Sequence, residues 1–499
     1  MVKRLGKIRR LNWLFILLLF VVLPFRLYHL TYPLLDAHFF RQTQTATIAL
    51  NFYNHGINLL QTELDIFGIG KEKYITLEFP LYEAIVAVFY KIFFESSIWG
   101  RVVSILASFL GAWYLFKLVV LLVRNEKIAF FSSFFFLFAP LNMFYQRSFM
   151  IEPLVITLLL SGIFYFCHFV NFNDKKSYLL SVVLLTLGFI HKGIYGPFWL
   201  LPITVYYLKK RSFREIFSAK FILALIVPLA VLFFWQKHVD YINTVNGHEY
   251  FTSYNKGHME WNFGSAMDRL SFALWGSYLQ QLLNGIFLKP GLVIFLIGLA
   301  FIPKIKNSSF FLSGLISQII YFIVFFKIQS HNYYQAVMIP VFSVFMSIGF
   351  VKVSELVKNN HFGSYLKISF MSVFCALFIY KSWINTLPSF YIDWDWYNRL
   401  KAVGSSVSDK SVGILATPGF DWNSVYTYIP RHKMLLVQAE NVTYENIIKW
   451  KKLGYSFMVL HEYEKYPDYF AVVAPGFSLD FLKADKLVLD IPEFKVYQF

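Results

Sequence analysis

Four separate turns of the sequence carry side chains that could handle a proton and a phosphate. The first, DAHFFRQTQ, holds Asp36, His38, Arg41 and Gln42, and Glu78 follows in the same loop. A carboxylate can take a proton from an acceptor hydroxyl or amine. Lys and Arg can hold a phosphate and stabilise it as it leaves. This loop alone therefore contains both kinds of group.

The other three turns are shorter and repeat the combination of acid, base and cation. Their chemically able side chains are Arg147, Glu152, His191, Lys192, His331, Tyr333 and Tyr334. Charged side chains at the ends of apolar segments are costly unless they pair, meet water or serve a site. Together the four turns predict group transfer from a phosphorylated lipid donor.

The residues of the first loop also have purely structural interpretations. Asp36 could cap a surface helix through residues 42–54, with His38 and Arg41 on its wet face. The Asp36-x-His38 pair could contribute to a metal site, but the sequence offers no third ligand at a defined spacing. A divalent cation is therefore unsupported, and we expect no cofactor to be required.

The later turns leave similar alternatives open. Glu152 precedes a proline at the start of an apolar segment. Its role could therefore be merely structural, as a cap of that helix or as a partner of Arg147. Lys192 could extend to lipid headgroups, as lysines at the ends of spans often do. His331 could be an ordinary interface residue. The chemical interpretation depends on whether all four turns face the same side of a membrane.

The composition indicates that membrane helices position these residues. Of the 499 residues, 57% are hydrophobic and only 15% are charged, whereas a soluble domain carries about 25% charged residues. The net charge of +17 comes from basic residues in short loops between apolar segments, which is typical of cytoplasmic loops and not of a nucleic-acid-binding face. Cys167 and Cys375 lie in apolar segments and are interpreted as packing residues.

Apolar runs of roughly 17 residues or more can cross the hydrocarbon core as helices. The sequence predicts about eleven such spans, starting near residues 11, 98, 127, 149, 177, 194, 220, 285, 308, 333 and 364. The first follows a basic N-terminus but has no small-residue cleavage site, so we interpret it as an uncleaved helix.

Basic clusters set the predicted orientation, because cytoplasmic loops are enriched in Lys and Arg. With the N-terminus in the cytoplasm, eleven spans place the clusters at 124–127, 175–176, 209–211, 304–306 and 352–358 on that side. Residues 31–97, 141–148, 191–193, 238–284, 328–332 and those after about 384 then lie outside. This parity requires that 80–94, which contains Glu83 and Lys91, is an amphipathic interfacial helix and does not cross.

The last stretch, 384–499, differs from the rest in composition. Charged residues return, and the apolar runs 412–416, 457–460 and 486–489 have the length of strands. Residues 444–453 have helical spacing. We expect a small extracytoplasmic α/β domain here, after a transmembrane domain at 1–383 whose first outer loop spans 31–97.

The order of these features resembles the GT-C glycosyltransferases that use polyprenyl-phosphate sugars. The similarity is to bacterial relatives of the protein O-mannosyltransferases and of the lipid A aminoarabinose transferase, and it covers residues 10–350. Its elements in order are Leu35-Asp36, Glu78-Phe79-Pro80, Arg101, Glu152-Pro153, Lys192-Gly193 and Tyr333-Tyr334 before Pro340. The resemblance implies a GT-C-like polytopic fold with juxtamembrane helices in the first outer loop.

The resemblance also implies roles for individual residues. Asp36 matches an acid that acts as the base or orients the acceptor, and Glu152 matches a second catalytic acid that is often Asp in relatives. Lys192 matches a lysine that contacts the donor phosphate. Relatives commonly have an acidic pair where this chain has Asp36-Ala37, and some have a lysine where it has Phe79. We therefore expect the donor phosphate to be shared by Arg41, Arg147 and Lys192.

The remaining side chains of the four turns are assigned to substrate binding. They are His38, Gln42, Glu78, His191, His331, Tyr333 and Tyr334. The predicted reaction moves a sugar from a polyprenyl-phosphate donor to a protein, lipid or glycan acceptor, with inversion, outside the bacterial inner membrane.

Two other classes of protein are alternatives. A transporter of lipid-linked sugars would show internal repeats and ionisable groups at the membrane midplane, and a non-catalytic scaffold would have an unremarkable first loop. The partners expected are this donor, an acceptor and membrane lipids, without nucleic acid.

Overall fold

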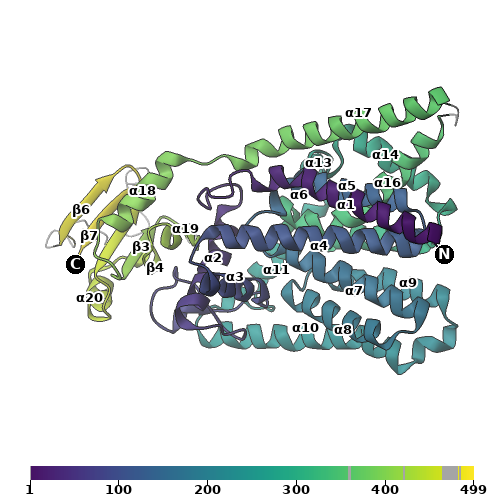
Figure 1. Cartoon of the computed structure of the whole chain (residues 1–499). Helices are drawn as coiled ribbons and strands as arrows, with labels where there is room; N and C mark the ends of the chain where they lie inside the picture. The colour runs from purple at the N-terminus through teal and green to yellow at the C-terminus, as the bar shows by residue number, and fades with distance from the viewer. Residues whose placement is uncertain (1, 358–360, 420–421, 463–481, 483–484) are drawn as a thin grey trace. The chain divides into compact units, whose positions relative to one another are not determined.

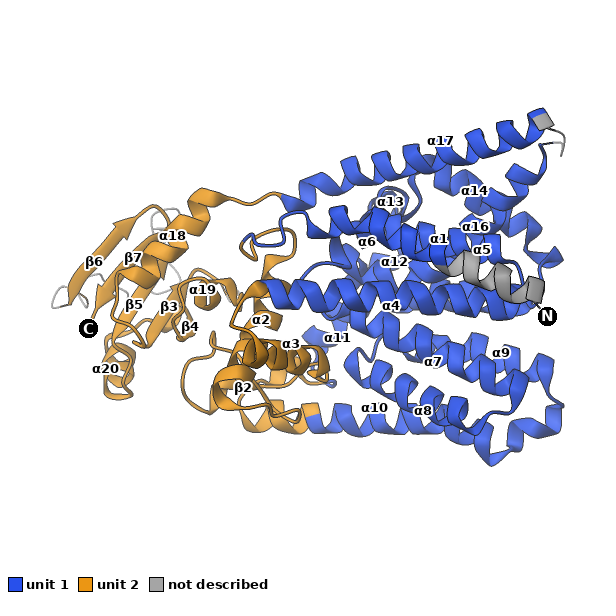
Figure 2. Cartoon of the chain, in the orientation of Figure 1, with its two compact units in different colours: residues 1–32, 98–238, 253–390 blue, residues 33–97, 239–252, 391–499 orange. Residues whose placement is uncertain are grey.

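A computed structural model shows the whole chain (Figure 1). It describes residues 2–357, 361–419, 422–462, 482 and 485–499, and the side chains of all of these except 2–12 and 361. The basic side chains at 3–10 and Lys358, which support the predicted orientation, lie outside this set. The chain forms two compact units (Figure 2). Unit 1 comprises Met1–Tyr32, Ile98–His238 and Ser253–Phe390, and unit 2 comprises Pro33–Ser97, Val239–Thr252 and Tyr391–Phe499.

Unit 1 is built from helices, most of them long and running along a common direction (Figure 1). They are α1 (Val2–Leu27), α4 (Ser97–Val123), α5 (Glu126–Phe138), α6 (Pro140–Tyr145), α7 (Glu152–Phe172), α8 (Lys175–His191), α9 (Leu200–Lys210), α10 (Ala219–Val245), α11 (Lys256–Phe263), α12 (Ala266–Leu270), α13 (Phe272–Leu282), α14 (Leu288–Phe301), α15 (Ser308–Val324), α16 (Ile339–Glu355) and α17 (His361–Thr386). The last residues of α10 belong to unit 2.

Six helical segments of the described chain are long and apolar enough to cross a membrane. They are Ser97–Val123, Glu152–Phe172, Ala219–Val245, Phe272–Lys304, Asn332–Glu355 and Phe362–Ser405. Trp13–Leu27 and Ser308–Val324 are shorter apolar helices. Each predicted span has a helical counterpart, but the count of about eleven crossings stays a prediction.

Some of the helices begin at residues that favour a helix start. The Asn125 side chain accepts hydrogen bonds from the first backbone N–H groups of α5, and Asp174 does the same for α8. Pro153 and Pro340 lie in the first turns of α7 and α16, where a missing N–H is tolerated. Helices α14 and α16 pack closely, because Gly298 and Gly349 let the two backbones touch.

Unit 2 combines helices with a two-stranded sheet, β1-β2, and a five-stranded sheet. Its helices are α2 (Phe39–His55), α3 (Leu81–Ile92), α18 (Trp394–Ser405), α19 (Val425–Tyr428) and α20 (Tyr444–Lys452), and its strands are β1 (Thr62–Glu63), β2 (Tyr74–Ile75), β3 (Gly413–Thr417), β4 (Met434–Gln438), β5 (Phe457–His461), β6 (Lys486–Ile491) and β7 (Phe494–Gln498). The predicted strands at 412–416, 457–460 and 486–489 and the helix at 444–453 are confirmed. The predicted amphipathic helix at 80–94 is α3.

The five-stranded sheet has the order β4-β3-β5-β7-β6. Strands β4, β3 and β5 are parallel, β7 pairs antiparallel with β5, and the edge strand β6 pairs antiparallel with β7. Ile447 and Trp450 of α20 are buried in one cluster with Ile414, Met458 and other apolar residues of the sheet. The small C-terminal sheet domain predicted from composition is therefore present.

Residues of the first loop extend this sheet at its β4 edge. The backbone N–H of Met434 donates to the Asp65 carbonyl at 2.9 Å, and that of Leu436 donates to the Ile66 carbonyl at 3.0 Å. The Gly68 N–H donates back to the Met434 carbonyl at 3.0 Å. The first loop and the C-terminal domain thus form one compact unit, whereas the sequence divided the chain at residue 383.

Candidate functional site

The predicted site residues fall into both units. Unit 1 contains Arg147, Glu152, His191, Lys192, His331, Tyr333 and Tyr334, and unit 2 contains Asp36, His38, Arg41, Gln42 and Glu78. Within each unit the structure brings several of them into direct contact. Their assigned roles stay predictions.

Glu152 and Lys192 form a buried ion pair in unit 1. Glu152 is the first residue of α7, and Lys192 directly follows α8, so the packing of α7 against α8 brings the two together. Lys192 Nζ contacts Glu152 Oε1, and the two side chains are 3% and 0% exposed. This geometry differs from two of the structural alternatives. Lys192 is buried and does not extend to lipid headgroups, and among the described residues the partner of Glu152 is Lys192 and not Arg147.

Three tyrosine rings surround the Lys192 ammonium. Its Nζ lies 5.2 Å from the ring centroid of Tyr195, 5.1 Å from that of Tyr333 and 4.5 Å from that of Tyr334. Aromatic faces attract a cation at such distances, more strongly where water is excluded. The Tyr-rich turn noted in the sequence therefore meets Lys192. Tyr195 was not predicted, although it lies only three residues after Lys192.

Two buried polar atoms beside this cation make no hydrogen bond to the described part of the chain. They are Oε2 of Glu152 and the hydroxyl of Tyr195. Native proteins satisfy nearly all buried polar atoms with protein, water or a bound group. The Lys192 environment thus has a fixed cation and two polar atoms with bonding capacity left for a small polar partner.

Arg147 follows α6 and contacts the backbone just after α1. It is fully buried, donates to the His29 carbonyl at 3.0 Å, and places its guanidinium 5.1 Å from the ring of Phe390. Arg101 donates to three carbonyls of the same segment, the shortest to Tyr32 at 2.5 Å. These two arginines therefore bind backbone carbonyls of the turn that follows α1.

Of the two histidines predicted for the site in unit 1, one is fully buried and the other is partly buried. His191 is the last residue of α8 and is fully buried. His331 stands edge-on to the ring of Trp261, with centroids 5.2 Å apart. Burial lowers the pKa of His331 below its ordinary value, so its imidazole is neutral near pH 7.

Asp36 is buried in unit 2 and accepts a hydrogen bond from the Gln42 side chain. Gln42 Nε2 lies 2.5 Å from Asp36 Oδ1 and 3.0 Å from the Ala37 carbonyl. Helix α2 begins at Phe39, and its N-cap is His38, in the left-handed conformation with φ 54°. The helix-cap interpretation of Asp36 is therefore wrong.

Arg41 and Glu78, both predicted from the sequence, form an ion pair with each other. Arg41 also donates to the Gln44 Oε1 at 3.0 Å. The guanidinium is buried. The part of the helix-cap interpretation that placed Arg41 on a solvent-exposed helix face is therefore wrong as well. Within unit 2, two sets of polar contacts thus cover the first turn of α2, one at Asp36 and one at Arg41.

Metal binding has no support in the described residues. Among them, no group of three or more His, Cys, Asp or Glu side chains lies close enough to hold a metal ion. Independence from a metal stays a prediction.

Comparison with known proteins gives one family match. Residues 78–236 match the family described as dolichyl-phosphate-mannose-protein mannosyltransferase. This stretch includes Glu78, Arg147, Glu152, His191 and Lys192. No curated protein matches the chain.

Solved structures share the fold of nearly the whole chain. ArnT from Cupriavidus metallidurans bound to undecaprenyl phosphate matches with a TM-score of 0.65 at 12% identity over 98% of both chains. Its apo state gives the same score and coverage at 13% identity. The Archaeoglobus fulgidus oligosaccharyltransferase in complex with Zn and sulfate matches with a TM-score of 0.52 at 13% identity, over 92% of this chain and 70% of that one. The predicted fold class, an α-helical integral membrane protein with a small C-terminal domain, is thereby confirmed.

Proposed function

We propose that this chain, whose family match and fold indicate the GT-C glycosyltransferase superfamily, moves a sugar from a polyprenyl phosphate to an acceptor. The observation that carries the proposal is the buried Lys192 cation, held by Glu152 and three tyrosine rings. The structure of ArnT bound to undecaprenyl phosphate supports a donor of the same lipid class.

Lys192 has the chemistry for the donor phosphate. A lipid phosphate brings negative charge toward an ammonium that already has one carboxylate partner, and it can share this cation as the departing group. Glu152 Oε2, which has no hydrogen bond to the described residues, can then accept one from a substrate hydroxyl. Arg41 and Arg147 are assigned supporting roles toward the same phosphate.

Asp36 is assigned the role of base. The acceptor hydroxyl gives its proton to the Asp36 carboxylate as its oxygen forms a bond to the anomeric carbon. The bond from that carbon to the phosphate oxygen breaks, and polyprenyl phosphate leaves with the electron pair. A single in-line displacement inverts the configuration of the sugar. No step needs a metal, because the cation at the phosphate is Lys192.

The remaining parts of the proposal follow from the sequence. The reaction occurs on the extracytoplasmic face of a bacterial inner membrane, and the acceptor is a protein, lipid or glycan. His38, Gln42 and Glu78 contact the acceptor or sugar from the first loop. His191, His331, Tyr333 and Tyr334 do so from the later turns.

The test is the substitution Asp36→Asn in the full-length enzyme. This change keeps the shape and removes the proton acceptor, so turnover with a polyprenyl-phosphate sugar should fall by about 10² to 10⁴-fold. Polyprenyl-phosphate affinity should stay within about twofold. A chelator should leave wild-type turnover unchanged.

Asp395→Asn is the matched control, because Asp395 is an exposed aspartate of the same unit. It should turn over like the wild type. If Asp36→Asn retains more than about a third of wild-type turnover, Asp36 is not the base. If the wild-type chain moves no sugar and binds no polyprenyl phosphate, the proposed function itself is wrong.

A further inference from the structure

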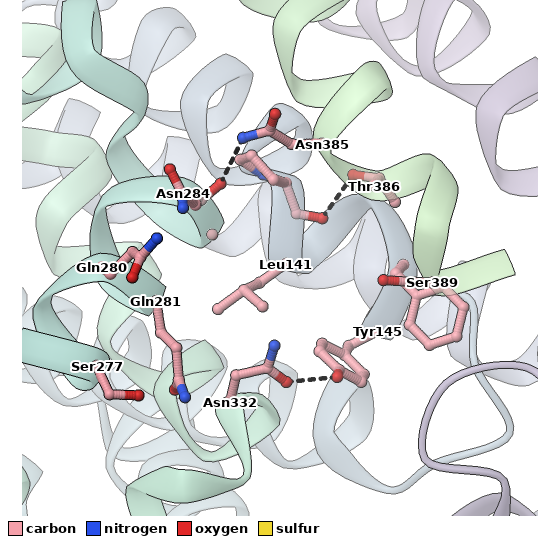
Figure 3. A pocket seen from close by; sticks show the side chains of 13 residues that line it. Leu141, Tyr145, Ser277, Gln280, Gln281, Asn284, Asn332, Asn385, Thr386 and Ser389 are labelled. Carbon is pink, nitrogen blue, oxygen red and sulfur yellow. Dashed lines mark hydrogen bonds between the residues drawn. The ribbon is translucent and has the colours of Figure 1, made fainter. Parts of the chain in front are cut away.

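A pocket in unit 1 lies outside the residues that the sequence singled out. It has a volume of about 270 Å³ and is lined by residues of α6, the α13–α14 region and the end of α17, and by Asn332 (Figure 3). This volume is below the ~300–1,000 Å³ of pockets for drug-sized ligands, so the pocket suits a single small ring and not an extended chain.

The lining of this pocket combines polar side chains with the apolar Pro140, Leu141 and Phe144, and among the described residues it carries no Asp, Glu, Lys, Arg or His. Its polar side chains are Tyr145, Ser277, Gln280, Gln281, Asn284, Asn332, Asn385, Thr386 and Ser389. Amides and hydroxyls offer donors and acceptors together, which matches the hydroxyl groups of a sugar. A ligand with an ammonium group would need a carboxylate partner in the pocket, and a ligand with a carboxylate would need a cation there. Because the described part of the lining offers neither, it favours an uncharged ligand.

Several of these groups are held in place by the protein. The Tyr145 hydroxyl donates to Asn332 Oδ1 at 2.5 Å, and Gln335 Nε2 donates to Gln281 Oε1 at 2.9 Å. Because its oxygen faces Gln335, the Gln281 amide points its nitrogen, a hydrogen-bond donor, away from Gln335. Asn284 lies in a π-helical turn, Leu283–Phe287, a feature that recurs at functional sites. Prearranged polar groups of this kind give a site orientation and specificity.

The pocket shares a wall with the Lys192 site. Asn332 lines the pocket, and the next residue, Tyr333, has its ring 5.1 Å from Lys192 Nζ. The rings of Tyr145 and Tyr333 are 6.0 Å apart. In a lipid-phosphate sugar, the sugar is bonded directly to the phosphate oxygen. A sugar pocket next to the phosphate cation is the arrangement that such a molecule requires.

We infer that this pocket binds one uncharged sugar ring, such as a neutral hexose, and selects against amino sugars and uronic acids. The inference rests on the proposed function and adds the class of sugar to it. The ring could belong to the lipid-linked donor or to a glycan acceptor, since both present the same hydroxyl groups.

The experiment measures binding to the full-length chain in nanodiscs. The probes are polyprenyl phosphate, a polyprenyl-phosphate neutral hexose, its amino-sugar and uronic-acid analogues, and a methyl hexoside. We expect the neutral hexosyl lipid to bind at least about tenfold more tightly than the charged analogues and than polyprenyl phosphate. In Asn284→Leu and Gln281→Met these ratios should fall to within about twofold, while affinity for polyprenyl phosphate stays unchanged.

The control is Asn262→Leu, the same change in α11, outside the pocket lining. It should keep the wild-type preference. Loss of methyl hexoside binding in Asn284→Leu, without change for the lipid sugars, would assign the pocket to a glycan acceptor. A preference among the lipid sugars that survives both pocket variants, together with unchanged methyl hexoside binding, overturns the inference and leaves the proposed function intact. Failure of every lipid probe to bind the wild type overturns both.

Discussion

At the scale of single residues, substitutions in the Glu152–Lys192 pair can show whether Lys192 binds the donor phosphate or only stabilises the fold. Both side chains are almost fully buried, so Lys192→Met leaves an uncompensated carboxylate. Breaking a buried pair in this way costs about 3–5 kcal/mol. We therefore expect Lys192→Met to lower the thermal stability of the purified protein markedly. The double variant Lys192→Met/Glu152→Gln removes both charges and should recover most of it.

Affinity for polyprenyl phosphate in the double variant then decides the role of Lys192. If Lys192 holds the phosphate, the recovered protein should bind at least about tenfold more weakly, a loss of about 1.4 kcal/mol. Glu152→Gln alone should keep this binding, because it leaves the cation in place. A double variant that binds like the wild type would make the pair purely structural.

The sequence located the charged residues of the site more readily than their partners. Glu152 and Lys192 were conspicuous because they interrupt apolar segments, where charges need a reason. Their pairing was not predictable, since it depends on how α7 packs against α8. Arg147 is a further example, because its partner is the backbone carbonyl of His29, just after α1, which leaves no mark in the sequence.

At the scale of elements, the edge of β4 positions the first loop. Gly68 has φ +78°, and a Cβ there would meet the Tyr455 hydroxyl and lie 3.1 Å from Leu435 Cβ. We expect Gly68→Ala to weaken this pairing, because the new methyl group forces loop and sheet apart. Overpacking of this kind costs about 1–3 kcal/mol. The expected result is faster proteolysis of residues 56–75 and a lower melting temperature.

Gly56 provides the control for backbone strain. Its φ is +96°, yet a Cβ there would have nothing within 4 Å. Gly56→Ala carries the positive-φ cost of an alanine but no clash, so it should be the milder of the two. Equal effects would mean that strain alone, and not contact with the sheet, explains the Gly68 result.

Elements with a strong local pattern were predictable, and their association was not. The strands β3, β5 and β6 and the helix α20 followed from short apolar runs and from helical spacing. The pairing of residues 65–68 with β4 consists of backbone hydrogen bonds. Any side chain can accompany such bonds, so the sequence gives no sign of them. The pocket at Asn284 escaped prediction for a related reason, since neutral amides stand out less than charges.

At the scale of the whole molecule, the prediction to be tested is the orientation of the chain in the membrane. Eleven crossings place the 175–176 cluster in the cytoplasm and residues after about 384 outside. Lys176 and Ser408 are both exposed in the structure. In a background that lacks Cys167 and Cys375, Ser408→Cys should react with a membrane-impermeant maleimide in intact cells. Lys176→Cys should react only after permeabilisation. Reaction of Lys176→Cys in intact cells would make the number of crossings wrong. The four turns would then no longer share one side, and the assignment of Asp36 and Lys192 to one reaction would lose its basis.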